Sequence, residues 1–437
     1  MEEKPTYKEA FLFWLKLGFI SFGGPVGQIA IMREFLVDKR KWISDNKFLH
    51  ALNYCYLLPG PEAQQLATYI GWLLHGTKGG ITAGVLFILP SIFILLTLSI
   101  LYAVFGSIPI VISMFNGLRP AVVAIVILAL YKITQKSLQT PLHYVLAIAS
   151  FIAIFFFNVL FPYIIVASII IGIIAQKLFP KLNKQTEKSK QATNEEGYYL
   201  NSNSKIPGTE FNTKRLLRQI VVLLVLWCLP FVLFYFLTDN FKFWSNMSMF
   251  FTQAAFVTFG GAYAVLPYVA QVSVSQFGWL SKGQMIDGFA LGETTPGPLI
   301  MILAFVGFMG GYNIFNHSIL SGTIGLLTTT YYTFLPCFLF IFVGAPIIEK
   351  TQDNTKIKSV LSIVTASVVG VILNLTVYFG IVVLFPKGVD FVLMDYTSLI
   401  WIIISVIALH KFKVDMILWI GISAVYGFFH NYLLSFG

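Results

Sequence analysis

Long apolar runs separated by short polar stretches dominate the chain. The runs lie near residues 11–31, 48–74, 81–105, 108–131, 142–157, 161–178, 216–238, 246–275, 284–311, 318–347, 357–385, 397–410 and 414–433. A helix that crosses about 30 Å of hydrocarbon needs about 20 apolar residues, and most of the runs reach this length. Stretches such as 92–105 are almost continuously apolar, unlike the alternating strands of a membrane barrel. The pattern therefore predicts an all-α integral membrane protein with many spans.

Two halves of the chain carry the same motifs at one spacing. The residues repeated at an offset of 237 are Phe22-Gly23-Gly24 with Phe259-Gly260-Gly261, Trp42 with Trp279, Ser44 with Ser281, and Pro59-Gly60-Pro61 with Pro296-Gly297-Pro298. Several motifs in one register indicate an internal repeat rather than unrelated helix breakers.

A polar stretch separates the two halves. Residues 181–212 are rich in Lys, Glu, Asn and Ser and carry too little apolar surface to pack, so they predict a flexible cytoplasmic linker. We therefore expect a first membrane repeat at 1–180, the linker at 181–212, a connecting transmembrane helix at 213–240 and a second repeat at 241–437.

Charged loops predict the orientation of the repeats, because Lys and Arg favour the cytoplasmic side. The basic loop at 33–47 would lie outside if run 48–74 crossed once, but Pro59-Gly60-Pro61 splits this run into two pieces of about 18 Å, too short to cross. A re-entrant hairpin is therefore expected there. In the second half, Lys350, Lys356, Lys358, Lys411 and Lys413 indicate cytoplasmic loops where the first half has external ones. The repeats are thus predicted to be inverted, with broken helices that meet near mid-membrane, as in many secondary transporters.

The broken helices suggest an anion site. Irregular backbone is tolerated at membrane depth where protein covers it or it lines a wet cavity. Proline at the first helical position starts a helix well, so Pro61 and Pro298 predict half-helices whose N–H groups and positive dipole ends attract anions. Further N–H donors are expected from Gly23, Gly24, Gly60 and their repeats. The alternative is that these breaks are only packing kinks.

Charged residues inside apolar runs are candidate functional groups. Arg119 lies near the middle of run 108–131, and its forked donors suit an oxyanion, although it could instead pair with Glu62. Lys16 precedes the first Gly-Gly break and could add charge or extend to the interface. Glu62 and Glu293 break the symmetry of the repeats and are candidates for carrying a proton, while Gln65 is a candidate hydrogen-bond donor.

Composition excludes several classes of protein. Of the 437 residues, 57% are hydrophobic and 11% are charged, which is far from a soluble enzyme. The net charge of +10 is spread over loops, so no nucleic-acid partner is expected. The cysteines and histidines are scattered, and no phosphate-binding loop is found, so neither a metal, a cofactor nor an ATP-driven mechanism is expected. A membrane enzyme would need a polar catalytic cluster that the sequence does not offer.

These motifs resemble the chromate ion transporter family in its long, two-repeat form. The matching segments are Phe22-Gly23-Gly24-Pro25, Leu57-Leu58-Pro59-Gly60-Pro61-Glu62-Ala63, Tyr69-Ile70-Gly71-Trp72, His75-Gly76, Leu89-Pro90-Ser91 and, in the second half, Thr295-Pro296-Gly297-Pro298-Leu299-Ile300. Gln28 stands where the family is expected to favour His.

The resemblance implies export of chromate from the bacterial cytoplasm by a multi-pass protein of the cytoplasmic membrane. Sulfate, another tetrahedral dianion, is an alternative substrate, an anion channel is an alternative mechanism, and a homodimer is left open. The candidate substrate-binding residues are Lys16, Gly23, Gly24, Pro25, Pro59, Gly60, Pro61, Gln65, Arg119, Gly260, Gly261, Pro296, Gly297 and Pro298.

Overall fold

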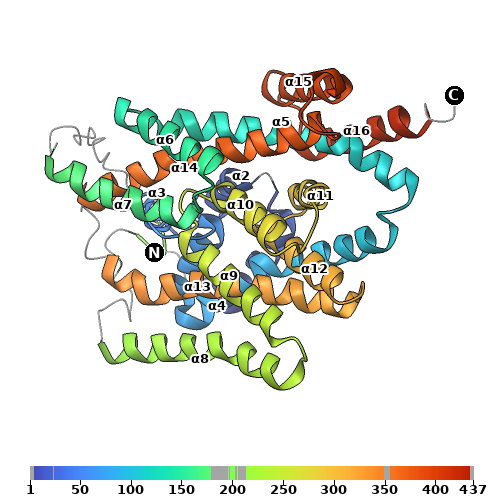
Figure 1. Ribbon diagram of the computed structural model, residues 1–437. Helices are drawn as coiled ribbons and strands as arrows, with labels where there is room; N and C mark the ends of the chain where they lie inside the picture. Colours follow the sequence, from blue (N-terminus) through green and yellow to red (C-terminus); the bar gives the residue numbers. More distant parts are fainter. Residues whose placement is uncertain are drawn as a thin grey trace.

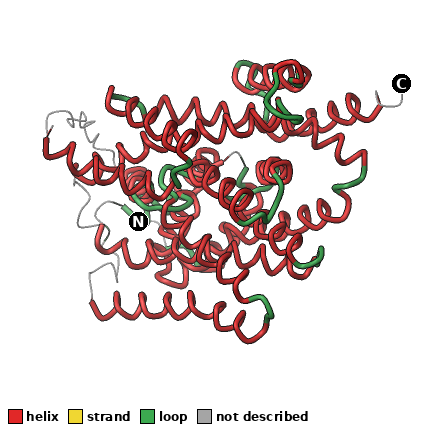
Figure 2. The backbone as a smooth tube through the Cα atoms, in the orientation of Figure 1, coloured by secondary structure: helices red, strands yellow, loops and turns green. Residues whose placement is uncertain are grey.

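The structure is a computed structural model that describes the whole chain except residues 1–3, 23, 179–194, 196, 202–203, 205–212, 349–354 and 434–437. Its elements are helices, and the described residues hold no strand beyond an isolated bridge between Ile43 and Leu200 (Figure 2). Five helices are long and apolar enough to cross a membrane, namely Glu62–Phe105, Pro109–Ser137, Thr213–Leu237, Ile319–Gly344 and Ser359–Leu384. The predicted all-α membrane fold is confirmed.

The first half of the chain folds into seven helices and a π-helical turn. These are α1 (Tyr7–Ile20), α2 (Gly24–Arg33), the turn η1 (Glu34–Lys39), α3 (Asp45–Cys55), α4 (Glu62–Phe105), α5 (Pro109–Ser137), α6 (Pro141–Phe157) and α7 (Phe161–Leu178). Helix α8 (Thr213–Leu237) follows the linker and packs on the outside against α9 (Phe241–Val257) and α13 (Ile319–Ile348) (Figure 1). None of its residues is buried, as expected of a helix that faces lipid.

The second half repeats this order. Its elements are α9 (Phe241–Val257), α10 (Ala262–Ala270), the turn η3 (Gln271–Gln276), α11 (Lys282–Glu293), the 3₁₀ turn η4 (Leu299–Met301), α12 (Ile302–Ile314), α13 (Ile319–Ile348), α14 (Thr355–Leu384), the 3₁₀ turn η5 (Phe391–Leu393), α15 (Tyr396–His410), α16 (Met416–Gly427) and the π-helical turn η6 (Phe428–Leu433). Packing is repeated as well, because the Phe13 and Trp42 rings lie 5.8 Å apart and their counterparts Phe250 and Trp279 lie at the same distance.

Each half contains a tight helical hairpin, and both hairpins turn in the gaps between predicted apolar runs, at 75–80 and at 312–317. Helix α4 reverses direction at His75 and Gly76, where Gly76 has φ +63°, so its two arms pack against each other. A Cβ on Gly79 would overlap the carbonyl of Gly71, so only glycine allows this approach. In the second half α12 and α13 form the same hairpin.

The hairpin turn is longer in the second half, which shifts the register of the repeats. Leu89-Pro90-Ser91 corresponds to Leu335-Pro336-Cys337 at an offset of 246, whereas the segments before the hairpins correspond at 237. The repeat therefore continues beyond the residues where a constant offset detects it.

The two halves are interlocked. Helix α5 packs against α15 and α16 of the second half, while α14 packs against α6 and α7 of the first half. Helices α5 and α14 contact each other and run in opposite directions (Figure 1). These reciprocal contacts agree with the predicted inversion of the repeats.

The described residues of the predicted linker, around Leu200, pack against the first repeat. The Leu200 N–H donates to the Trp42 carbonyl at 3.0 Å, and the Ser44 N–H donates to the Leu200 carbonyl at 2.7 Å. Leu200 is 4% exposed. Residues Tyr199 and Leu200 thus lie beside the basic loop at 33–47. Most of 181–212, together with Lys350 and the side chains of Lys356 and Lys358, lies outside the described residues.

Candidate functional site

The helix breaks of each repeat are joined to those of the other. The Gly297 N–H donates to the Ser21 carbonyl at 2.7 Å, and the Gly60 N–H donates to the Thr258 carbonyl at 2.7 Å. Ser21 and Thr258 are repeat counterparts, as are Gly60 and Gly297, so the two hydrogen bonds are equivalent. We call these four residues the crossed breaks. They confirm that the broken helices meet.

Glycine is required at the crossed breaks by backbone geometry and by space. Gly60 has φ +122° and Gly297 has φ +100°, which side-chain-bearing residues rarely adopt. A Cβ on Gly297 would overlap Ser91 Oγ, and a Cβ on Gly60 would lie 3.0 Å from Cys337 Sγ. We call Pro59-Gly60-Pro61 and Pro296-Gly297-Pro298 the re-entrant tips. Each tip therefore packs against the second arm of the helical hairpin of the opposite repeat. At the second tip, the Ser91 hydroxyl also donates a hydrogen bond to the Pro296 carbonyl at 2.5 Å.

The prolines of the tips stand one residue earlier than expected. Pro61 is the N-cap of α4, which begins at Glu62, and Pro298 is the N-cap of the 3₁₀ turn at Leu299. Their extended conformation, rather than a first helical position, directs the chain into each half-helix. Each half-helix therefore begins one residue later than predicted, and the first-turn N–H groups of α4 have no acceptor within the helix.

Not all expected N–H donors are available for an anion. Those of Gly60 and Gly297 are used by the crossed breaks, so they hold the repeats together. Gly260 and Gly261 have φ +82° and +92°, and Gly260 is exposed. Gly24 has φ +69° and is half-buried together with Pro25, whereas Gly23 lies outside the described residues.

The two half-helices differ in chemistry. The first begins with Glu62, Gln64 and Gln65, all buried, whereas Leu299, Met301 and Ile302 occupy the equivalent positions of the second. Gln65 Nε2 donates to the Pro59 carbonyl at 2.7 Å, and Gln28 Nε2 donates to the Gly297 carbonyl at 2.5 Å. Polar side chains thus brace both tips from the first repeat.

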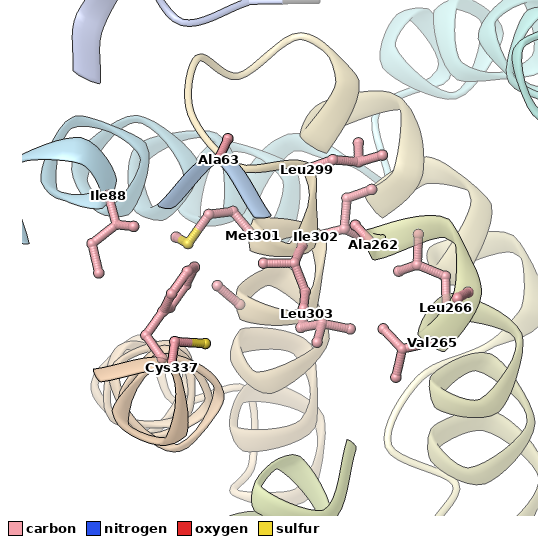
Figure 3. Close-up of a cluster of buried hydrophobic side chains, with 14 of the residues drawn as sticks. Ala63, Ile88, Ala262, Val265, Leu266, Leu299, Met301, Ile302, Leu303 and Cys337 are labelled. Atoms are coloured by element: carbon pink, nitrogen blue, oxygen red, sulfur yellow. The ribbon is translucent and has the colours of Figure 1, made fainter. Parts of the chain in front are cut away.

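The start of the second half-helix is sealed by apolar side chains. Figure 3 shows a compact apolar cluster in which this segment packs, made of Ala63, Ile88, Ala262, Val265, Leu266, Leu299, Met301, Ile302, Leu303 and Cys337. A charged substrate has no polar partner among these side chains. The polar part of the site therefore lies on the first half-helix.

The two acidic candidates have different surroundings. Glu293 is 5% exposed and accepts a hydrogen bond of 2.7 Å from the Tyr263 hydroxyl. Glu62 is 7% exposed, and its Oε1 lies 3.3 Å from the position that a Cβ on Gly261 would occupy. Its Oε2 has no hydrogen-bond partner among the described residues. Glu62 thus lies between the start of α4 and the break that separates α9 from α10.

Arg119 is engaged by an acid that the sequence analysis missed. Its Nε and Nη2 donate to the two carboxylate oxygens of Asp287 at 2.8 and 2.9 Å, and the Tyr102 hydroxyl donates to the same carboxylate at 2.8 Å. The carboxylate that pairs with Arg119 is therefore Asp287, and not Glu62 as the alternative interpretation had it. Asp287 lies inside run 284–311, so the rule that selected Arg119 would have found it.

Lys16 is not part of this arrangement of breaks. It lies four residues before the end of α1 and is exposed, whereas the next residue, Leu17, is fully buried. The structure thus brings together Pro59, Gly60, Glu62, Gln65 and Gly261 among the predicted site residues and leaves Lys16 on the surface of its helix. Among the described residues no cluster of three or more His, Cys, Asp or Glu could hold a metal.

Comparison with known proteins decides the family. The sequence matches the chromate transporter family over residues 8–173 and 245–428, which are the two halves on either side of the linker and α8. The chain belongs to the chromate transporter family. It is a multi-pass membrane protein of a family of transporters, as its long apolar helices indicate.

Full-length relatives come from several organisms. The chain is 28% identical to an uncharacterized transporter of Methanocaldococcus jannaschii, over 97% of this chain and 94% of the relative. It is 26% identical to a chromate transport protein of Cupriavidus metallidurans (94% and 90%) and 29% identical to one of Pseudomonas aeruginosa (84% and 79%). No solved structure matches the chain.

Proposed function

We propose that this protein exports chromate from the cytoplasm across the bacterial cytoplasmic membrane, as a secondary transporter built from inverted repeats. The reciprocal hydrogen bonds of the crossed breaks carry the proposal, because they join the two repeats at the point where each helix is interrupted. A substrate held between two such repeats is exposed to either side when one repeat rocks against the other. The names of the bacterial relatives support chromate as the substrate.

The oxyanion binds at the first half-helix in this proposal. The start of α4 supplies unpaired N–H groups and the positive end of a helix dipole, and Gly260 and Gly261 leave room for a close approach. Sulfate has the same charge and shape as chromate, so this geometry alone would accept both. Arg119 remains a candidate for this site only if it can leave Asp287.

The membrane potential suffices as the energy source. Moving one charge through about 100 mV is worth about 2.3 kcal/mol, so a dianion gains about 4.6 kcal/mol on leaving a cell that is negative inside. This free energy supports a gradient of about a thousandfold. Coupling to protons through Glu62 or Glu293 would modify this gradient and is not required for export.

Uptake into inverted membrane vesicles tests the proposal. Vesicles that contain the protein should accumulate chromate when their lumen is positive, and the uptake should saturate and show counterflow. Parallel measurements with sulfate and molybdate define the substrate. Flux that does not saturate and shows no counterflow would indicate a channel instead, and uptake equal to that of vesicles without the protein would refute oxyanion transport.

A further inference from the structure

We propose that the Glu62 carboxyl occupies the place of a substrate oxygen at the start of α4, and that the oxyanion replaces it there once the carboxyl has been protonated and moves aside. The inference rests on the proposed function, because it names the position at which the transported oxyanion binds. It also assigns the site to one of the two half-helices.

The position of Glu62 is that of a bound anion. It is the first residue of α4, where N–H groups that have no acceptor within the helix and the helix dipole favour negative charge. The side chain is 7% exposed, and Oε2 has no hydrogen-bond partner among the described residues. A buried carboxylate oxygen without a donor is costly, so this oxygen is held in a place that suits a ligand better than a structural role.

Gly261 forms the opposite wall of this position. Gly261 has φ +92° and carries no side chain, so its backbone lies close to Glu62. A Cβ on Gly261 would lie 3.3 Å from Glu62 Oε1. The space between α4 and this break therefore accommodates one carboxylate or one group of similar size and charge. An oxyanion and the Glu62 carboxylate cannot both occupy it.

The opposite half-helix offers no second site. Leu299 is the repeat counterpart of Glu62 and packs in the apolar cluster of Figure 3. Met301 and Ile302 replace Gln64 and Gln65 in the next turn. One oxyanion per chain is therefore expected, although the fold is built from two repeats.

The other titratable groups around Glu62 are thiols, phenols and an ammonium group, so Glu62 is the carboxyl that titrates at this position. Cys55 and Tyr56 at the end of α3 and Lys136 near the end of α5 interact electrostatically with it. Cys337 of α13 lies beside Gly60, while Tyr263 of α10 is bonded to Glu293.

Lys136 supplies positive charge close enough to interact electrostatically with Glu62. Its ammonium group is exposed and lies 4.5 Å from the centre of the Tyr56 ring. A cation at this surface attracts an oxyanion toward Glu62 without being buried itself.

The sign of the pH dependence follows from charge. An ionised Glu62 repels a dianion and occupies its place, so binding weakens as the pH rises through the titration of this carboxyl. A protonated Glu62 carries no charge and can donate a hydrogen bond to the oxyanion. Glu62→Gln imitates the protonated form at every pH.

Equilibrium chromate binding to purified protein tests the inference. Between about pH 5.5 and about pH 8.5, a range in which buried carboxyls titrate, wild-type affinity should fall about tenfold more than that of Glu62→Gln. Protonation of chromate itself affects both proteins equally, so this difference isolates Glu62. Glu62→Asp keeps the carboxyl and should retain the wild-type pH response, as should Glu34→Gln, which changes an exposed acid.

The outcomes separate the two proposals. An equal pH response in wild type and Glu62→Gln, with chromate bound by both, would overturn the role of Glu62 and leave oxyanion transport intact. Binding of two chromate ions per chain would overturn the single site. Absence of chromate binding and uptake at every pH in the wild type would refute the proposed function together with this inference.

Discussion

A half-buried arginine such as Arg119 can serve either to bind a substrate anion or to form an ion pair within the protein. A guanidinium without a partner in hydrocarbon is costly, so Arg119 needs an anionic partner. The sequence alone does not distinguish whether this partner is a bound oxyanion or a carboxylate of the protein. The structure provides the carboxylate of Asp287, which is 2% exposed and accepts two parallel hydrogen bonds. Such an arrangement has lost most of its hydration and depends on both partners being present.

Removing one partner of this pair should destabilise the fold. Asp287→Ala removes two charge-assisted hydrogen bonds of Arg119 and is expected to cost about 1.5 to 3 kcal/mol, since the guanidinium that remains is partly exposed and keeps a hydrogen bond to Asn116. Arg119→Lys keeps the charge but loses the fork, so a smaller loss is expected. Thermal unfolding in detergent measures both, and Arg33→Lys in the exposed pair with Asp45 is a matched control with little effect.

Chromate affinity separates stability from binding in the same variants. If Arg119 serves the ion pair, folded Arg119→Lys should bind chromate as the wild type does. Weaker binding at unchanged thermal stability would instead assign the guanidinium to the substrate.

At the scale of elements, the re-entrant tips owe their shape to glycine at two crowded positions. Gly297 combines φ +100° with a close approach to Ser91, and its counterpart Gly60 combines φ +122° with a close approach to Cys337. A strained backbone conformation of this kind costs about 1 to 3 kcal/mol for other residues. A side chain at either glycine would therefore introduce both backbone strain and steric overlap at the contact between the two repeats.

Gly297→Ala should therefore lower thermal stability by more than this strain alone and abolish transport. Replacing Ser91 by Ala in the same chain removes the overlapping Oγ and should restore part of the stability. Gly380→Ala is the control, because a Cβ there meets no atom within 4 Å. Wild-type stability and uptake in Gly297→Ala would contradict the assigned role of this tip.

The linker segment at 197–201 forms a second element that depends on tertiary contacts. Its bridge to Ile43 and the burial of Leu200 were not predicted, because the three residues Tyr198, Tyr199 and Leu200 form only a short apolar stretch inside a polar segment. Leu200→Asp places a charge in this contact and should release the segment. Hydrogen exchange measures the effect: the amides of Leu200 and Ser44 should lose protection, whereas Ser204→Ala should leave them protected. Unchanged protection in Leu200→Asp would show that Leu200 does not hold the segment.

At the scale of the whole molecule, the repeated motifs predicted the architecture because breaks leave strong local signals. Glycine and proline mark where each helix stops, so the re-entrant tips and the α1–α2 interruption followed from sequence. The turn at Gly76 lies between the predicted runs 48–74 and 81–105, but the close packing of the two arms of α4 depends on tertiary contacts that the runs do not contain. Asp287 was open to the same rule as Arg119, because it lies inside run 284–311. Its pairing with Arg119 was not predictable, because the two residues are 168 positions apart and are joined by the packing of α11 against α5.

Inversion of the repeats can be tested by accessibility. Single cysteines at Lys39 and Gly278 lie in or beside corresponding turns of the two repeats, so inverted repeats place them on opposite faces of the membrane. Each is introduced into a chain in which the exposed Cys228 is replaced by Ser. Impermeant thiol reagents applied to intact cells and to inverted vesicles should label one position each. Labelling of both from the same face would contradict inversion.

The central claim is that an oxyanion passes between the repeats at the crossed breaks, driven by the membrane potential. Chromate accumulation in proteoliposomes at a clamped potential tests this claim most directly. A lumen positive by about 100 mV should draw chromate in, up to about a thousandfold if two charges move and about fiftyfold if a proton accompanies each ion. Reversing the potential should reverse the movement, and Gly297→Ala should show none. Accumulation that is independent of the sign of the potential, or equal to that in protein-free liposomes, would contradict the account.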